Sequence, residues 1–127
     1  MKEEIKILVQ NLVEAEKLYD EQLDRINDGS IKLLLAFANR RKALHSKEIG
    51  RLFQIDLKEL ESSKNNTLDF AEDVNQASIK NWIATVEKDI MNQYERILSA
   101  NKFDPVQTFV LKNHMKSQKI ILDEVRS

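Results

Sequence analysis

The scarcity of chain-breaking residues constrains this sequence most. Its 127 residues include two glycines and one proline, which leaves little material for the turns of a β fold. Leu, Ile, Glu and Lys, which tolerate helices well, are frequent. Hydrophobic residues make up 42% and charged residues 32%, which is typical of a folded chain rather than a disordered one. We therefore expect a single all-α domain over residues 1–127.

Net charge and cysteine content exclude several classes of function. The net charge of -1 argues against a nucleic-acid binder driven by bulk electrostatics. Without cysteine there is no disulfide framework, thiol nucleophile or thiolate metal site. Residues 1–17 are too charged for a signal peptide, and no run of about 18 apolar residues predicts a membrane span. A cytoplasmic protein with no membrane or nucleic-acid partner is the default expectation.

Apolar residues recur at helical spacing in four segments of the chain. These segments predict helices over residues 2–26, 30–60, 79–100 and 105 onward. Residues 67–76 are predicted to form a short helix or an ordered loop. Short connections follow the first and third helices, so the simplest fold is an up-down-up-down four-helix bundle. An intermolecular coiled coil is the alternative, although the apolar arcs are wider than a two-position seam.

Turn and cap residues mark the boundaries of these helices. Gly29 suits the left-handed position after the first helix, and Asp28 or Ser30 can cap the second. Ser78 is the expected cap of the third helix. Gly50, inside the second helix, is interpreted as a tolerated surface position. The clearest boundary precedes the fourth helix, where a capping box with a first-turn proline is predicted from Asp104, Pro105 and Gln107.

The second helix carries ionisable residues inside its apolar arc. The arc consists of Leu34, Phe37, Ala38, Leu44, Ile49, Leu52 and Ile55. Arg41, His45 and Glu48 project near its centre, and buried charges need partners. We predict a buried ionic network in which Arg41 pairs with Glu16, Glu87 or Glu48. Its predicted members are Glu16, Arg41, His45, Glu48, Glu87, Tyr94, His114 and Gln118.

A metal site is the second interpretation of this polar layer. Bundles that bind two metal ions take a Glu from each of two helices and Glu-x-x-His from each of the other two. The possible ligands here, for iron or manganese, are Glu16, His45, Glu48, Glu87 and His114. The pattern is damaged, because Lys42 stands three residues before His45 and Leu111 three residues before His114. Arg41 would also repel a cation, so we expect no cofactor.

Residues 87–94, Glu-Lys-Asp-Ile-Met-Asn-Gln-Tyr, resemble the third helix of an uncharacterised bacterial ferritin-like family, a domain of unknown function. The helix around His45 and the Asp28-Gly29 connection are similar as well, and the resemblance covers most of the chain. It implies a ferritin-like four-helix bundle with no established activity. The two departures from the paired-carboxylate pattern argue against iron oxidation or storage. We find neither a nucleophile with its base nor a phosphate-binding glycine loop.

These observations favour a non-enzymatic interaction or structural module. Such a module would act through a protein partner or through self-association. A divergent di-metal carboxylate–histidine protein is the alternative.

Overall fold

The computed structural model describes residues 2–60 and 76–127, and these residues form five α-helices without a strand. The all-α prediction is therefore confirmed. The predicted element at residues 67–76 lies, apart from Gln76, outside the described residues. The helices are α1 (Lys2–Leu23), α2 (Gly29–Leu52), α3 (Leu57–Leu60), α4 (Gln76–Ala100) and α5 (Pro105–Arg126).

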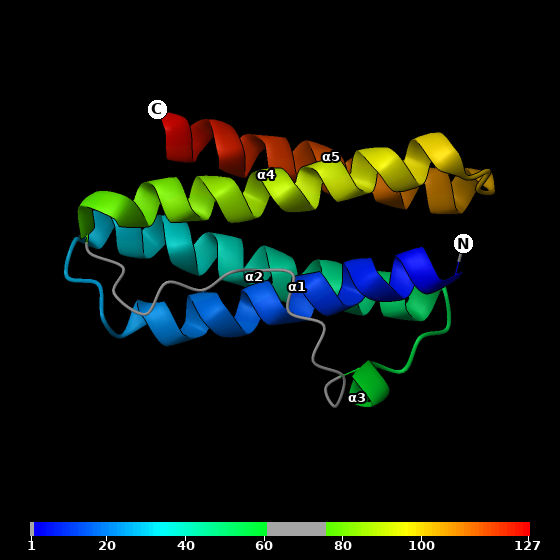
Figure 1. The fold of residues 1–127 in the computed structure, drawn as a ribbon, viewed down its shortest axis with the longest axis horizontal. Helices are drawn as coiled ribbons and strands as arrows, with labels where there is room; N and C mark the ends of the chain where they lie inside the picture. Colours follow the sequence, from blue (N-terminus) through cyan, green and yellow to red (C-terminus); the bar gives the residue numbers. More distant parts are fainter. Residues whose placement is uncertain (1, 61–75) are drawn as a thin grey trace.

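The four long helices lie side by side in two layers, with α1 and α2 below α4 and α5 in Figure 1. Each layer is an antiparallel pair joined by a short connection. Across the layers, α1 contacts α4 and α2 contacts α5. Asn11 and Gln93, near the middle of α1 and α4, are joined by a hydrogen bond, and Glu4 at the start of α1 accepts one from Asn101 just beyond the end of α4. These two bonds make α1 and α4 antiparallel.

The direction of the helices differs from the prediction. Because α1 is antiparallel to both α2 and α4, α2 and α4 run the same way, and the order is up-down-down-up (Figure 1). The predicted up-down-up-down order is therefore wrong. Its reasoning required short connections, but residues 53–75 separate α2 from α4. A segment of that length has ample reach to join opposite ends of the helices.

Two of the predicted helix starts are confirmed. The Asp104 side chain accepts a hydrogen bond from the Gln107 amide at 2.7 Å, and the Gln107 side chain accepts one from the Asp104 amide at 3.1 Å. This capping box satisfies amides that the first turn of α5 cannot satisfy itself. Asp28 caps α2 through its carboxylate, which accepts hydrogen bonds from the backbone amides of Ser30 and Ile31.

Two other boundary predictions are wrong. Gly29 is the first residue of α2 and has no positive φ, so the connection does not use its left-handed freedom. Ser78 lies inside α4, which already begins at Gln76, and is not its cap.

The second helix ends at Leu52 instead of near Leu60. Gln54 adopts a left-handed backbone with φ 55°, and the Ile55 amide donates to the Gly50 carbonyl at 2.8 Å. This six-residue closure is a common way to stop a helix. Gly50 is buried there, and a Cβ on it would lie 3.3 Å from the Ile55 carbonyl oxygen. The surface interpretation of Gly50 is therefore wrong, because the position needs close backbone approach.

The buried face of α2 also differs from the predicted arc. Phe37 and Leu44, expected inside, are 41% and 43% exposed. The true inner face is rotated by roughly a quarter turn from the predicted arc. It recurs at alternating steps of four and three residues, as in a coiled-coil seam: Ile31, Leu35, Ala38, Lys42, His45 and Ile49. This rotation decides which polar side chains enter the core.

Candidate functional site

Lys42, and not Arg41, is the positive charge buried between the long helices. The Lys42 side chain is fully buried, and its Nζ lies 2.8 Å from Oε1 of Glu87, which is also fully buried. The ammonium also donates to the side-chain oxygen of Gln118. Gln118 in turn donates from Nε2 to the Glu87 carboxylate at 3.3 Å and to the Glu87 carbonyl at 3.2 Å. One closed cluster therefore joins α2, α4 and α5.

Opposing effects act on the protonation of this cluster. Burial lowers the pKa of Lys42, while the charge and hydrogen bond of Glu87 raise it. Tyr19 from α1 is fully buried, and burial together with the nearby Glu87 carboxylate raises the pKa of Tyr19 well above its ordinary value. An isolated charge in this position would be costly, so Lys42 and Glu87 are stable there as a pair.

A stacked histidine pair lies beside this cluster. The rings of His45 and His114 have centroids 3.8 Å apart and an interplanar angle of 13°. Nε2 of His114 lies 3.2 Å from a Glu48 carboxylate oxygen, and Nδ1 lies 3.0 Å from the Tyr94 hydroxyl. Because the carboxylate can only accept, the proton of neutral His114 belongs on Nε2, and Nδ1 accepts from Tyr94. The second cluster thus also joins α2, α4 and α5.

Both imidazoles are held in the neutral form. Burial, followed by repulsion from His114, Lys42 and Arg41, lowers the pKa of His45 to about 2. Burial also lowers the pKa of His114, although the hydrogen bond and charge of Glu48 oppose that shift. A second positive charge would enter a region that already contains the Lys42 ammonium. The stacked arrangement of His45 and His114 therefore requires both rings to be neutral, as they are at pH 7.

Six of the eight predicted network residues lie in these two clusters: His45, Glu48, Glu87, Tyr94, His114 and Gln118. Arg41 does not, because it is half-buried and its guanidinium lies 5.0 Å from the ring centroid of Phe37. The prediction that Arg41 is the buried counter-charge is wrong, since Lys42 holds that place.

Glu16 also lies apart from the two clusters. Its side chain is half-buried at the α1–α2 surface, where burial raises its pKa and the Lys47 charge lowers it. Its backbone carbonyl accepts a hydrogen bond from Nδ2 of the Asn39 side chain at 2.7 Å. Glu16 therefore contributes to the contact between α1 and α2. The α1 residue that lies near Glu87 is the fully buried Tyr19.

The spacing of apolar residues along α2 could have predicted that Lys42 is buried, but the broader apolar arc was used instead. Leu35, Ala38, His45 and Ile49 surround Lys42 at alternating three- and four-residue steps, which places Lys42 on the same seam. Sequence reasoning treated it as a departure from a metal motif.

The candidate metal ligands do not converge on one point. In residues 2–60 and 76–127, no three His, Asp or Glu side chains are grouped so that they could hold an ion. Glu87 is engaged by the Lys42 ammonium, and both ring nitrogens of His114 have partners. In these contacts the Lys42 ammonium provides the positive charge that a metal ion would otherwise bring to Glu87.

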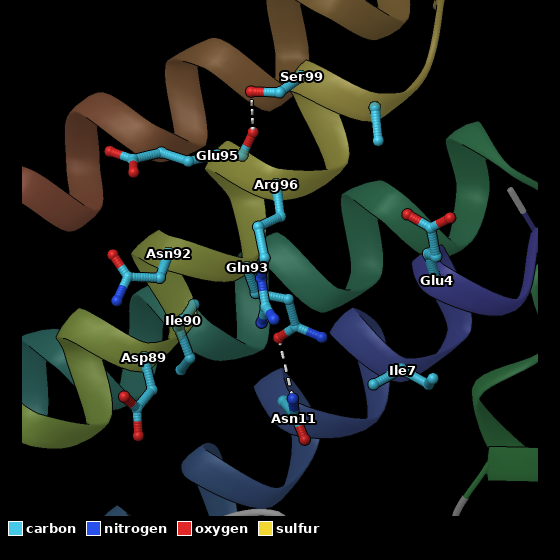
Figure 2. Close-up of a pocket in the computed structure, with 11 residues that line it drawn as sticks. Glu4, Ile7, Asn11, Asp89, Ile90, Asn92, Gln93, Glu95, Arg96 and Ser99 are labelled. Atoms are coloured by element: carbon cyan, nitrogen blue, oxygen red, sulfur yellow. Dashed lines mark hydrogen bonds between the residues drawn. The ribbon is translucent and has the colours of Figure 1, made fainter.

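The outer side of α1 and α4 carries an open groove of about 1110 Å³. Figure 2 shows Asn11 and Gln93 pointing toward one another there, and their side chains share a 2.9 Å hydrogen bond. The carboxylates along the groove belong to Glu4, Asp89 and Glu95. The Ser99 hydroxyl donates to the Glu95 carbonyl at 2.7 Å, so it is not arranged with a base as a nucleophile. Arg96 lines the groove as well, so three carboxylates and one guanidinium give it a net acidic surface without a catalytic pair.

None of the described helices combines the length and apolar character needed to cross a bilayer. The ferritin-like resemblance rests on the residues of this chain. Comparison with family models, curated proteins and solved structures finds no match.

Proposed function

We propose that this chain is a ferritin-like four-helix bundle without a metal centre, which serves as a non-enzymatic interaction or structural module. The observation that carries the proposal is the fully buried Lys42 ammonium, 2.8 Å from Glu87. In di-metal bundles, inward carboxylates are neutralised by bound cations. Here the chain supplies that charge from its own α2 helix, which lets the centre remain folded without an ion.

Helix order and residue placement support the ferritin-like part of this proposal. Ferritin-like bundles have one long crossover connection, and an up-down-down-up order with one long connection fits that description. The inward His45 and His114 lie on α2 and α5, and the inward Glu87 lies on α4. These are three of the side-chain positions that a di-metal pattern uses. Lys42 and Leu111 stand where its remaining carboxylates on α2 and α5 would be.

Metal content tests this proposal directly. Protein purified without chelator should contain no stoichiometric iron, manganese or zinc by elemental analysis. Added Fe²⁺ or Mn²⁺ should leave the melting temperature unchanged, because a ligand that does not bind the native state cannot stabilise it. A full equivalent of any of these metals would overturn the proposal.

A gain-of-binding variant tests the ferritin-like geometry separately. Lys42→Glu together with Leu111→Glu restores Glu-x-x-His on α2 and α5. This variant should be stabilised by Mn²⁺, by about 2.7 kcal/mol when the free ion is at 100 times its Kd. The matched control, Lys42→Gln with Leu111→Gln, has similar volume without the carboxylates and should respond much less. Equal responses of the two folded variants would contradict a ferritin-like centre.

The alternative function is the divergent metal site predicted from Glu16, His45 and Glu87 with Glu48 or His114, although Glu16 lies apart from the other four in the described structure. The observation in its favour is Nδ1 of His45, which is buried without a hydrogen-bond partner in the described structure. This alternative expects Fe²⁺ or Mn²⁺ to raise the melting temperature of the unaltered protein, and His45→Ala to abolish the rise. Superimposable melting curves with and without metal would remove it.

A further inference from the structure

The outward side of α2 carries a second seam, whose residues remain exposed among the described helices. Its residues follow one another at alternating steps of four and three, as the inner seam does, but on the opposite side of the helix. Leu33, the first of them, is 75% exposed. We define this outer seam as Leu33, Phe37, Arg40, Leu44, Lys47 and Arg51, all of which are exposed.

Most of the large exposed hydrophobic side chains among the described residues lie on α2 and α5. Three of them belong to the seam itself, and α5, the antiparallel neighbour of α2, adds Val106, Phe109 and Ile120 at 63%, 70% and 59% exposure. On the described remainder of the surface, Ile7 on α1 is the large hydrophobic residue in the same class, at 39%. A solvent-facing helix stripe is ordinarily polar, so three exposed apolar residues at seam spacing on α2 indicate an interaction surface.

The charges around the seam define the chemistry of its partner. Arg40, Lys47 and Arg51 lie in the seam, and α2 contains one acidic residue, Glu48. The exposed lysines of α5, Lys112, Lys116 and Lys119, line a hollow against α4 and do not belong to the seam. The acidic groove lies on the other side of the bundle, between α1 and α4. A surface that combines apolar and basic positions is complementary to one that combines apolar and acidic positions.

A second copy of this chain does not supply that complement. Parallel pairing of two outer seams would set Arg40, Lys47 and Arg51 against themselves, and like charges at facing positions are destabilising. Antiparallel pairing would set basic side chains against Leu33, Phe37 or Leu44 and leave their charges without partners. The opposite, acidic side of the bundle presents Ile7 as its exposed large hydrophobic residue.

An anionic bilayer fits the seam less well than a protein helix does. Membrane-surface helices place basic residues along the flanks of a continuous apolar face, from which they reach the headgroups. In this seam Arg40 and Lys47 lie on either side of Leu44, within the stripe itself. The half-buried Glu48 beside it is bound to His114 and would also face the anionic headgroups. Alternating apolar and charged positions instead suit knobs-into-holes packing against one helix.

The geometry points to the outer seam of α2 as a docking site for an amphipathic helix of another protein. That helix carries apolar residues opposite Leu33, Phe37 and Leu44 and carboxylates opposite Arg40 and Arg51. The inference rests on the proposed function and specifies the partner class. Metal analysis and the binding test below are independent measurements, so failure of one can be told from failure of the other.

The test uses two synthetic helices of about 21 residues, or three heptads. Both carry Leu at the seam positions that face Leu33, Phe37 and Leu44. One has Glu opposite the basic positions and the other has Lys there. Chemical-shift mapping on the ¹⁵N-labelled full chain should show the Glu peptide bound along α2, with an affinity roughly tenfold or more above that of the Lys peptide at low salt.

Two sets of variants sharpen the assignment. Arg40→Glu with Arg51→Glu should reverse the preference, so that the Lys peptide binds better than the Glu peptide. Leu33→Ser with Leu44→Ser should weaken the Glu peptide by roughly tenfold. Ile7→Ser, the matched control on the other side of the bundle, should leave its affinity unchanged. All these positions are exposed, and circular dichroism verifies that each variant remains folded.

Several results would overturn the inference. One is equal affinity for the two peptides, or binding of neither. Others are shifts that map to the α1–α4 groove, or failure of the charge-reversed variant to change its preference. Stable dimerisation in sedimentation that is lost with Leu33→Ser and Leu44→Ser would assign the seam to a second copy. Binding to phosphatidylglycerol vesicles without binding to the Glu peptide would assign it to a membrane.

Discussion

The inner and outer faces of α2 have the same spacing, and each combines apolar with ionisable residues. The inner face buries Lys42 and His45, whereas the outer face exposes Leu33, Phe37 and Leu44. The two ionisable side chains of the inner seam lie against neighbours from other helices, Lys42 against Glu87 and His45 against His114. The exposed apolar side chains have no such helix in the described structure. On this helix, available partners decide burial more than side-chain polarity does.

The inner face is stable as a set rather than residue by residue. Burying a polar group without a hydrogen bond costs about 1–3 kcal/mol, and an unpaired charge costs more. The long aliphatic stem of Lys42 can pack among apolar neighbours while its ammonium reaches Glu87 and Gln118. Replacing one polar residue of the inner face should therefore lower the free energy of unfolding by more than its own contact contributes. Substitutions on the outer face should change that free energy little.

The largest expected effect follows from Lys42→Met. Met preserves much of the volume but leaves the Glu87 carboxylate buried without its counter-charge, so unfolding free energy should fall by about 3–5 kcal/mol. Urea unfolding monitored by circular dichroism measures the loss. An exposed lysine, Lys116 on α5, provides the control: Lys116→Met should change stability by less than about 0.5 kcal/mol. Similar stabilities of the two variants would show that the inner face does not depend on Lys42.

Acidification should give the next largest effect, because folding holds His45 and His114 neutral. Their pKa values are lowered in the folded state, that of His45 to about 2, so the unfolded chain binds more protons below pH ~6.5. Stability is then complete above that pH and falls as pH decreases, by roughly 1.4 kcal/mol per pH unit for each ring that stays neutral. Glu16, whose pKa is raised, acts in the opposite direction, but its side chain is half exposed.

Urea unfolding between pH 4.5 and 7 measures this acid dependence. His45→Phe retains a ring beside His114 but removes one titrating group, so its stability should fall less steeply with acid than that of the unaltered protein. A stability that stays constant or rises between pH 7 and 4.5 would contradict the neutral histidine stack.

Tyr94→Phe should produce a smaller loss within the inner cluster. It deletes the hydroxyl 3.0 Å from Nδ1 of His114 and leaves that buried nitrogen without its donor. The expected cost is about 1–3 kcal/mol, measured by urea unfolding at pH 7. The variant should also shift the His114 ring resonances in NMR spectra. Unchanged stability together with unchanged resonances would mean that this hydrogen bond is absent.

The smallest effects should come from Arg41→Met and Leu44→Ser. Arg41 is half-buried over the Phe37 ring, and Leu44 is 43% exposed. Surface changes of this kind are usually within about 0.5 kcal/mol. Thermal melting of both variants provides the measurement. A loss approaching that of Lys42→Met would show that the two faces of α2 have been assigned incorrectly.

Local chemistry made some elements of this fold predictable from the sequence. Asp104 and Gln107 determine the start of α5 through hydrogen bonds between residues three positions apart. The local sequence is therefore enough to predict this boundary. The inner face of α1 was also readable, because residues such as Leu8 and Leu12 recur on one side without a competing stripe. These features do not depend on the rest of the fold.

Features that depend on distant partners were not predictable in the same way. The exposed Phe37 and Leu44 drew the predicted arc of α2 away from its true inner face, and Lys42 was overlooked although the seam spacing included it. The helix order depended on where the long connection returns, which periodicity does not encode. For the candidate site, residue types and their helices were foreseeable, but the stacking of His45 on His114 requires the assembled bundle.

A double-mutant cycle on Lys42 and Glu87 tests the central claim most directly. Lys42→Met, Glu87→Met and the paired variant are unfolded in urea under identical conditions, and the coupling energy is the departure from additivity. The account predicts that each single change is strongly destabilising and that the pair recovers much of the loss, giving a coupling of at least about 2 kcal/mol. Additive losses, with no recovery in the pair, would contradict the claim that Lys42 is the buried counter-charge of Glu87 between these helices.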